Sequence, residues 1–327
     1  MTFTVADRIQ GCLKGIATGD AIGKQTETLS PQDVLRWYPH GIQGFEGAPG
    51  AIISRYVGNS KREWRIGETT DDTERTVAVA RAIVSARRIS REDVGRELLA
   101  CRKCVHPGIK SLWEFHQAGD PARIATGHDG CGAAVRVSPV GIFHTSTSLD
   151  DLVRDAREVS IPTHGGSLAI AAAAATAAAV SAAIDAASPL EVLDIAERPA
   201  AEAERLWPGR SSPMFGEAIR TAHDLLVSLG NLRASRIAAR WFPDQPLTIV
   251  PLALGLATVM RSCEEAILLA ANIGGDSDSV ASIAGGILGA MYPDTVNHRW
   301  WNVVETENKH DLVALGNELA TLRQRVS

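Results

Sequence analysis

The sequence has few of the features that mark secreted, membrane-bound or nucleic-acid-binding proteins. Its 327 residues include only five cysteines, an odd number that does not suit the disulfide framework of a secreted protein. Basic residues are scattered and the formal net charge is −5, which argues against nucleic acid or an anionic membrane as a partner. The first residues, MTFTVADRIQ, lack the basic end and apolar stretch of a secretory signal. We therefore expect a cytoplasmic protein.

Two of the cysteines, Cys101 and Cys104, form a CxxC pair. No second pair follows at the spacing of a zinc site, and a single pair is weak support for redox chemistry. Ordinary buried or surface thiols are therefore the favoured interpretation, with a zinc or redox role as the alternative.

The only long apolar run is built from alanine. Residues 167–187 (SLAIAAAAATAAAVSAAIDAA) are about as long as a membrane span, but Asp185 lies near the end of the run. Alanine is the best helix former and is only weakly hydrophobic. We therefore predict a tightly packed central helix of a soluble protein.

Helical periodicity dominates the rest of the chain, and strand-like alternation is scarce. Ser90, Ser148 and Ser262 are each followed within a turn by acidic residues, as expected of helix N-caps. The best strand candidate is VRVSPVGIF (135–143), although Pro139 weakens it. The predicted helices cover residues 5–18, 73–88, 91–105, 150–159, 167–187, 214–229, 249–260, 263–272, 279–291 and 307–325.

No proline-rich linker, charge block or internal repeat divides the sequence. Residues 39–67 are rich in glycine and polar residues and have no period, which is typical of a functional lid or rim. We predict one compact all-α domain, residues 1–327, with roughly ten or more helices.

Two acidic clusters each precede a helical run. TTDDTE (69–74) carries Asp71 and Asp72, and GGDSDS (274–279) carries Asp276 and Asp278. Helix capping alone accounts for acidic residues in a first turn, but a cap needs one acceptor and each cluster offers two carboxylates and a hydroxyl. Hard divalent cations, Mg²⁺ above all, prefer such oxygen ligands. If folding brings the clusters together, they suit two ions about 3.5–4 Å apart; solvated caps are the alternative.

Small residues mark the helices beside these clusters. GCLKGIATGDAIGKQTE (11–27) places Asp20 between Gly19 and Gly23, with Glu27 one short loop further on. Two interpretations are open for this segment. In the structural one, Gly23 closes the helix in a left-handed cap; in the functional one, Glu27 is a carboxylate that faces a pocket. The helix after GGDSDS is predicted to pack closely against another backbone because of its small residues, Ser282, Ala284, Gly285, Gly286, Gly289 and Ala290.

Five motifs, in order along nearly the whole chain, resemble the ADP-ribosylglycohydrolase family. This family includes enzymes that remove ADP-ribose from modified nitrogenase reductase and from modified arginine or serine. The resemblance implies an all-helical, roughly orthogonally packed domain with two Mg²⁺ ions, or Mn²⁺ in their place, in a cleft. The motifs are GCLKGIATGDAIG, TTDDTE, GCGAAVRVSP, PTHGGSLAIAAAAA and GGDSDSVASIAGGILGA.

The resemblance also implies roles for individual residues. Glu27 and Asp276 would act in catalysis, and Asp20 would support the metal ligands or the substrate cleft. Ser279 stands where the family commonly has threonine, and it keeps the hydroxyl. By position, the implied metal ligands are Thr70, Asp71, Asp72, Asp276, Asp278 and Ser279.

The middle motifs would form the substrate cleft. Gly130, Gly132 and Arg136 match a glycine-rich stretch whose backbone N–H groups cradle phosphate. His164 matches a Thr-His pair near the ligand in similar proteins; the alternative is a buried histidine that caps the alanine-rich helix.

The sequence departs from the family pattern at several of these positions. Cys131 replaces the usual asparagine, Val135 the usual methionine, and residues 67–69 a short aromatic lead-in, with Trp64 just before them. Asp129 adds a negative charge that disfavours a diphosphate. A substrate smaller than an ADP-ribosylated protein therefore stays open.

We predict a magnesium-dependent hydrolase that cleaves an N- or O-ribosidic bond in an ADP-ribosylated protein or a small ribosylated molecule. Metal-bound water and an oxocarbenium-like transition state suit that reaction, and Glu27 would trade protons with the water or the leaving group. One alternative is a ribosidase that acts on a free nucleoside or ribosylated metabolite. The other is a non-catalytic relative, since the family includes lens crystallins. The sequence leaves the oligomeric state open.

Overall fold

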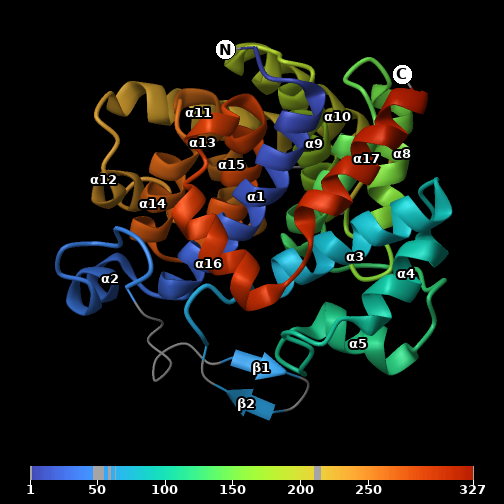
Figure 1. Ribbon diagram of the computed structural model, residues 1–327, viewed down its shortest axis with the longest axis horizontal. Coiled ribbons are helices and arrows are strands. Elements are labelled where there is room, and N and C mark those ends of the chain that lie inside the picture. The colour runs from blue at the N-terminus through green and yellow to red at the C-terminus, as the bar shows by residue number, and fades with distance from the viewer. Residues whose placement is uncertain (1, 47–54, 58–59, 63, 210–214, 327) are drawn as a thin grey trace.

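The computed structural model describes residues 2–46, 55–57, 60–62, 64–209 and 215–326, and helices make up most of it (Figure 1). The all-α fold class is confirmed, with one antiparallel pair of short strands, β1 (Arg55–Val57) and β2 (Ser60–Arg62), at the periphery. The helices are α1 (Val5–Gly23), η1 (Lys24–Thr26), α2 (Pro31–Trp37), α3 (Asp71–Ala86), α4 (Arg91–Ala100), α5 (Lys110–Ala118), α6 (Gly132–Arg136), α7 (Ser138–Phe143), α8 (Leu149–Ser160), α9 (Ser167–Ile184), α10 (Pro189–Leu206), α11 (Phe215–Leu229), α12 (Ala234–Ala238), α13 (Pro246–Val259), α14 (Cys263–Ile273), α15 (Ser277–Met291), η2 (Pro293–Thr295), α16 (His298–Asn308) and α17 (Leu312–Val326).

The helices α1 and α15 lie antiparallel in the middle of the molecule with their backbones in contact (Figure 1). Four glycines at four-residue spacing form one face of α1. A Cβ atom on any of them would lie only 2.0–2.5 Å from a carbonyl oxygen of α15, so only glycine permits this approach. The close backbone packing predicted for residues 279–291 is therefore confirmed. The facing pairs are Gly11 with Gly289, Gly15 with Gly285, Gly19 with Ala281, and Gly23 with Ser277.

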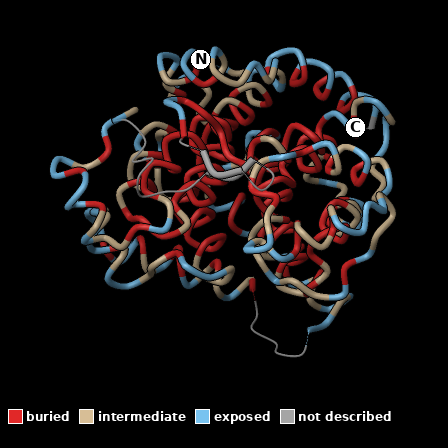
Figure 2. The backbone as a smooth tube through the Cα atoms, turned by 90° about the horizontal axis from the view of Figure 1, so that it is seen from below, coloured by how far each residue is buried: buried red, intermediate tan, exposed pale blue. Residues whose placement is uncertain are grey.

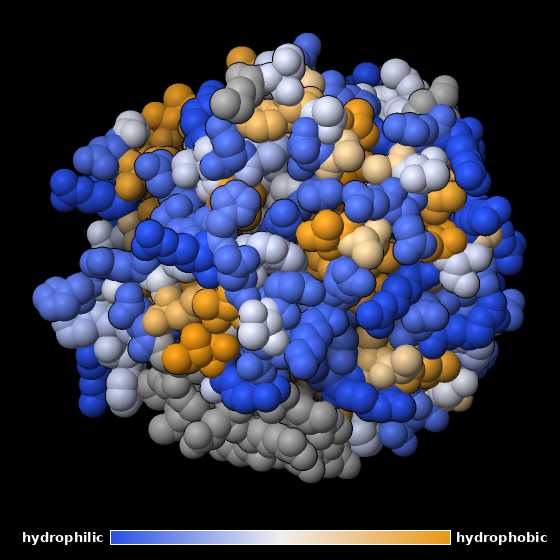
Figure 3. Space-filling view, viewed as in Figure 1, coloured by the Kyte–Doolittle hydropathy of each residue, from blue (hydrophilic) through white to orange (hydrophobic). Residues whose placement is uncertain are grey.

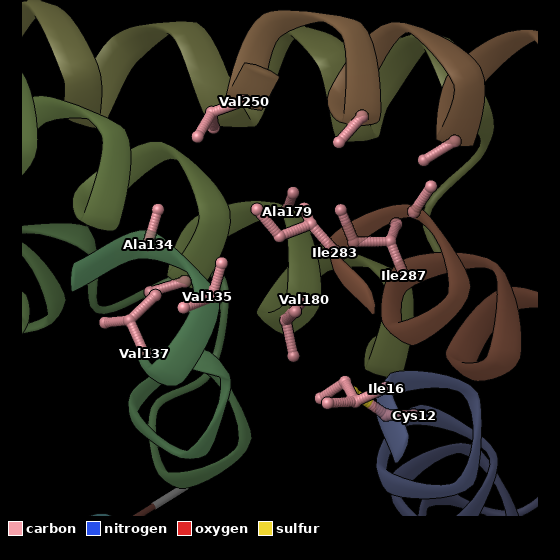
Figure 4. Close-up of a cluster of buried hydrophobic side chains, with 14 of the residues drawn as sticks. Cys12, Ile16, Ala134, Val135, Val137, Ala179, Val180, Val250, Ile283 and Ile287 are labelled. Atoms are coloured by element: carbon pink, nitrogen blue, oxygen red, sulfur yellow. The ribbon is translucent and has the colours of Figure 1, made fainter. Parts of the chain in front are cut away.

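The alanine-rich helix α9 lies inside the protein. It is long and apolar enough to cross a membrane by length and composition alone, but 89% of it is buried against neighbouring helices. Figure 4 shows Ala179 and Val180 of α9 between Val135 and Val137 on one side and Ile283 of α15 on the other. The predicted packed central helix is thus present, and its small side chains let several helices approach it.

The buried residues lie along the inner parts of the helices, and the exposed ones lie around the outside of the molecule (Figure 2). Most buried apolar side chains, from Ile9 to Leu322, belong to one hydrophobic cluster, and Trp64 and Cys104 form a small second one. The surface in Figure 3 is mostly hydrophilic, and its apolar residues lie in small separate patches. The assignment of residues 1–327 to one domain stays a prediction.

The strand predicted for residues 135–143 is wrong: this segment forms α6 and α7. Val135, Val137, Val140 and Ile142 are all at most 1% exposed. A short segment that is buried on every side carries no reliable period. Pro139 lies in the first turn of α7, where a helix tolerates proline because that N–H has no partner within the helix.

Several local predictions differ from the structure. Ser90 and Ser262 cap α4 and α14 through their side chains, whereas Ser148 precedes α8 without a side-chain cap bond. Gly23 has a right-handed φ of −62°, so it does not close α1 in a left-handed cap. The 39–67 segment contains β1 and β2, but residues 47–54, 58–59 and 63 lie outside the described residues, so its role as a lid stays a prediction.

Candidate active site

The structure brings the two acidic clusters together at one end of the α1–α15 pair. Ser279 Oγ donates a 3.1 Å hydrogen bond to Asp72 Oδ2 across 207 positions of sequence. Thr70 is the N-cap of α3, and its hydroxyl accepts the Asp72 N–H at 3.1 Å. Asp72, Asp278 and Ser279 are all buried, with exposed fractions of 7%, 4% and 4%. The cluster is therefore held away from bulk water, where isolated carboxylates are costly.

Asp20 holds the first acidic cluster in place by hydrogen bonds to the start of α3. Its carboxylate accepts the N–H groups of Thr70 at 3.0 Å and Thr73 at 3.1 Å, and it also accepts the Thr73 hydroxyl. These are the unpaired N–H groups at the start of α3, where negative charge is favoured. Asp20 is completely buried, and desolvation raises its pKa although these hydrogen bonds oppose the rise. The structure thus gives it a positioning role between α1 and α3.

The second cluster is held by a glycine turn that also fixes the loop with Glu27. Thr28 N–H donates to Gly275 O at 2.7 Å, and Gly275 N–H donates to Leu29 O at 2.9 Å. Gly274 and Gly275 have φ angles of +80° and +70°, which glycine adopts without strain. The two glycines of GGDSDS therefore let the chain turn and pair with residues 28–29. This pairing holds Glu27 beside the acidic turn.

Burial and mutual repulsion shift the pKa values of the clustered carboxyls. Desolvation, together with repulsion from Asp71 and Asp278, raises the pKa of Asp72 well above its usual value. Desolvation likewise raises the pKa of Asp278, against the opposing effect of Lys24. Burial alone would also raise the pKa of Asp71, but Arg75 and other partners lower it overall. The buried carboxylates therefore need compensating positive charge, and the chain supplies more of it to Asp71 than to Asp72.

Two buried cations of the chain lie within the cluster. Arg75 pairs with Asp71, and Lys24 pairs with Glu27 and lies 4.0 Å from Asp278 Oδ2. The other oxygen, Asp278 Oδ1, is buried and has no hydrogen-bond partner among the described residues.

The oxygens of the two acidic turns suit a hard cation by their chemistry, but they do not surround one common point in this structure. Carboxylate and hydroxyl oxygens are the ligands that Mg²⁺ prefers, and the unpaired oxygen of Asp278 has a vacant acceptor site. Over the described ranges, no three His, Cys, Asp or Glu side chains are arranged as a ready metal site. Asp72 accepts from Ser279 and Asp276 accepts from Cys131 Sγ at 3.1 Å. In this arrangement those oxygens are bound by groups of the chain itself.

His164 lies against the glycines of the middle motif. A Cβ on Gly130 or Gly132 would lie 3.3 or 2.9 Å from the imidazole, so these glycines make room for the ring. Thr163 Oγ1 accepts from Arg136 at 2.8 Å and shares a 2.7 Å hydrogen bond with His164 Nδ1. The other ring nitrogen, Nε2, lies 3.4 Å from Ser111 Oγ. Burial, with Arg136 next, lowers the pKa of His164 well below its usual value, so the ring is neutral.

Arg136 and Asp129 are both bound to backbone groups. Arg136 is fully buried and donates to Val159 O at 2.8 Å and Ser160 O at 3.1 Å. The carboxylate of Asp129 accepts Leu168 N–H at 2.9 Å and caps the start of α9. Arg136 therefore holds residues 159–163 just ahead of His164, and Asp129 takes the anion position at the helix end. His164 itself does not cap α9.

Comparison with known proteins agrees with these motifs. A sequence model described as ADP-ribosylglycohydrolase matches residues 1–327. The chain belongs to the ADP-ribosylglycohydrolase family.

Similar proteins of this family extend over almost the whole chain. The Escherichia coli protein YegU is 27% identical, with 98% of both chains covered. Human ADP-ribosylhydrolase ARH3 is 23% identical, over 94% of this chain and 92% of its own. A solved structure titled "ADP-ribosylglycohydrolase-related protein complex" has a TM-score of 0.64 at 22% identity, over 98% of this chain and 99% of its own. The structural match shows the fold.

Sequence reasoning missed several residues of the site. Lys24 directly follows the motif GCLKGIATGDAIG, which ends at Gly23, and the sequence alone does not show that its ammonium meets the acidic turns. Arg75 follows the acidic cluster by one helical turn from Asp71, a spacing that predicts an ion pair. The CxxC thiols are free and buried, and Cys104 contributes a hydrogen bond to Asp71. The charge pattern of the sequence would have revealed Arg75 but not Cys104.

Proposed function

We propose that the protein is a divalent-cation-dependent hydrolase, with Mg²⁺ as the natural ion and Mn²⁺ as a substitute. Its reaction is cleavage of an N- or O-ribosidic bond that releases ADP-ribose from a modified protein side chain or a small molecule. The observation that carries this proposal is the 3.1 Å hydrogen bond between Ser279 and Asp72. It joins the two acidic turns of a chain whose family is that of ADP-ribosylglycohydrolases.

The residues of the two turns would hold the cation. Mg²⁺ bound there supplies Lewis acidity that orients ribose hydroxyls and lowers the pKa of a water. The ligand set would comprise oxygens of Thr70, Asp71, Asp72, Asp276, Asp278 and Ser279. Of these, Asp278 Oδ1 is buried without a hydrogen-bond partner among the described residues.

Glu27 is the group that moves a proton. Its side chain is 26% exposed, so it reaches the solvent side of the acidic turn while pairing with Lys24. Hydrolysis at an anomeric carbon needs a proton to be taken from water and one to be given to the leaving group. Glu27 pairs with Lys24 in the resting protein, and a carboxylate is the form that acts as a general base. Asp20 holds the start of α3 in register throughout, so the oxygens of Thr70 and Asp72 stay in place.

A second candidate is a ribosidase that acts on a smaller substrate without a diphosphate. Asp129 favours it, because its carboxylate already occupies the N-terminus of α9 at 2.9 Å from Leu168 N. A diphosphate at this position would meet a like charge and would have to displace a cap. The tight packing of Gly130 and Gly132 on His164 also fills space in the middle motif.

The function is tested by incubation with defined substrates. Peptides that carry ADP-ribosyl-arginine or ADP-ribosyl-serine and a panel of free nucleosides are each incubated with Mg²⁺ or with EDTA. Released ADP-ribose or ribose is then measured by chromatography. We expect release with Mg²⁺ only, and its loss in Asp276→Ala and Asp278→Ala. Asp294→Ala, which changes an exposed acidic residue of η2, serves as the matched control and should keep full activity.

The outcomes separate the candidates. Cleavage of ADP-ribosyl peptides supports the proposal, whereas cleavage of nucleosides alone supports the ribosidase. Full activity of Asp276→Ala or Asp278→Ala would remove the metal mechanism. A folded protein that cleaves nothing and binds no Mg²⁺ by calorimetry would be a non-catalytic member of the family.

A further inference from the structure

The acidic cluster contains a lysine ammonium in its interior. The side chain of Lys24 is only 7% exposed. Its Nζ pairs with Glu27, lies 4.0 Å from Asp278 Oδ2, and stands 4.6 Å from the centre of the Trp64 ring. Opposite charge and an aromatic face are the surroundings that make a buried ammonium tolerable. Lys24 is therefore held within the cluster rather than lying over it.

A second cation of the chain compensates the other side of the cluster. The side chain of Arg75 is 2% exposed, and it pairs with Asp71 while donating to Lys103 O at 3.1 Å. The bond to Lys103 O fixes the guanidinium beside Asp71. Arg75 thus occupies one of the two carboxylate oxygens of Asp71, Oδ2.

The remaining oxygens are enough for one cation. Asp72, Asp276 and the unpaired Oδ1 of Asp278 have no cationic side chain paired with them among the described residues. Mg²⁺ is typically held by one or two carboxylates and keeps several waters, so this set is sufficient. Two ions would need further carboxylates to bridge them, and those carboxylates are paired with Arg75 and Lys24.

We propose that the acidic cluster binds one divalent cation, and that the Lys24 ammonium occupies the position that a second one would take. This inference rests on the proposed cation dependence and specifies its stoichiometry. It differs from the two ions that the family resemblance implies. The fixed charge of Lys24 cannot dissociate, so cation binding follows a single-site isotherm.

The test counts bound Mn²⁺ per chain. The full-length protein is dialysed to equilibrium against Mn²⁺, and bound metal is measured by atomic emission and by the loss of the free-ion signal in electron paramagnetic resonance. We expect one Mn²⁺ per wild-type chain. Lys24→Met keeps the length of the side chain and removes its charge, which frees Glu27 and Asp278 Oδ2, so this variant should bind two.

A lysine on α1, the helix that ends just before Lys24, provides the matched control. Lys14 stands 5.7 Å from the ring centre of Trp301, outside the acidic cluster, and Lys14→Met should still bind one Mn²⁺. Lys24→Gln is a second variant with a polar end, for which two Mn²⁺ are also expected if Lys24→Met fails to fold.

The proposal and the proposed function fail in different ways. Two Mn²⁺ in the wild type, or a single one in the folded Lys24 variants, would overturn the stoichiometry and leave the cation-dependent hydrolase intact. No bound Mn²⁺ in the wild type would overturn both.

Discussion

The contact between α1 and α15 gives a stability prediction whose size follows from the structure. In Gly19→Ala, the new Cβ would lie 2.2 Å from Ala281 O and 2.5 Å from Ala281 C, more than about 1 Å inside van der Waals contact. Both neighbours are backbone atoms, so no side-chain rotation relieves the clash and the helices have to separate. Overpacking of this kind costs up to about 3 kcal/mol, and the better helix propensity of alanine offsets about 1 kcal/mol. We expect a net loss of about 2 kcal/mol in the free energy of unfolding.

Urea denaturation followed by circular dichroism measures this loss. Gly216→Ala in α11 is the matched control, because its nearest neighbour would be 3.4 Å away, an ordinary contact. This control should be as stable as the wild type or more stable by up to about 1 kcal/mol. If Gly19→Ala unfolds at the same urea concentration as the wild type or a higher one, the close contact between the two helices is refuted.

Two further substitutions test how the site and the C-terminal helix are held. Asp20→Asn should cost about 1–2 kcal/mol and weaken Mn²⁺ binding, because the amide has one acceptor oxygen for the N–H groups at the start of α3; unchanged affinity by calorimetry would contradict this role. Asp185→Asn should lower the free energy of unfolding by about 1–3 kcal/mol at pH 7, because Asp185 accepts from Ser146 N–H at 2.8 Å and from the buried Arg323 at 2.6 Å. Burial alone would raise the pKa of Asp185, but these hydrogen bonds and the charge of Arg323 lower it overall. Its contribution is therefore present above the ordinary carboxyl pKa of about 4 and is lost as pH falls through the lowered value. The difference between wild type and Asp185→Asn should shrink between pH 5 and pH 2, and a constant difference would rule out this ion pair as its source.

Much of the fold was predictable because the helix-forming patterns are local. Capping residues such as Ser90 and Ser262 mark helix starts by a mechanism that needs no tertiary contact. The contact between α1 and α15 was predictable in part. The small side chains of residues 279–291 predicted close packing, and the glycines at 11, 15, 19 and 23 carry the matching four-residue spacing. Together they predict that the two helices pack against each other, whereas their antiparallel direction comes from the structure.

Other features depend on tertiary contacts that leave no local signal. The segment 135–143 was predicted as a strand, yet it is helical, because a short segment that is buried on every side carries no reliable period. Helix α10 was missed although Ser188 and Glu191 form a capping box at its start; Pro199 inside the helix interrupts the pattern. Residues 307–325 were predicted as one helix, but Lys309 and Asp311 have left-handed φ angles of 53° and 55° that separate α16 from α17.

The candidate site shows the same division. The acidic turns were found because each offers two carboxylates and a hydroxyl, more acceptors than a helix cap needs, and the turns do lie side by side. The compensating cation Lys24 was missed, because its distance to Asp278 follows from the meeting of two helices that are far apart in sequence. The cap formed by Asp129 was missed for the same reason.

The position of a bound cation tests the central claim most directly. Crystals grown or soaked with Mn²⁺ are measured at a wavelength where manganese scatters anomalously. The account predicts an anomalous peak about 2.2 Å from carboxylate oxygens of Asp72, Asp276 and Asp278. A peak elsewhere, or none at saturating Mn²⁺ with the two turns still in contact, would contradict it.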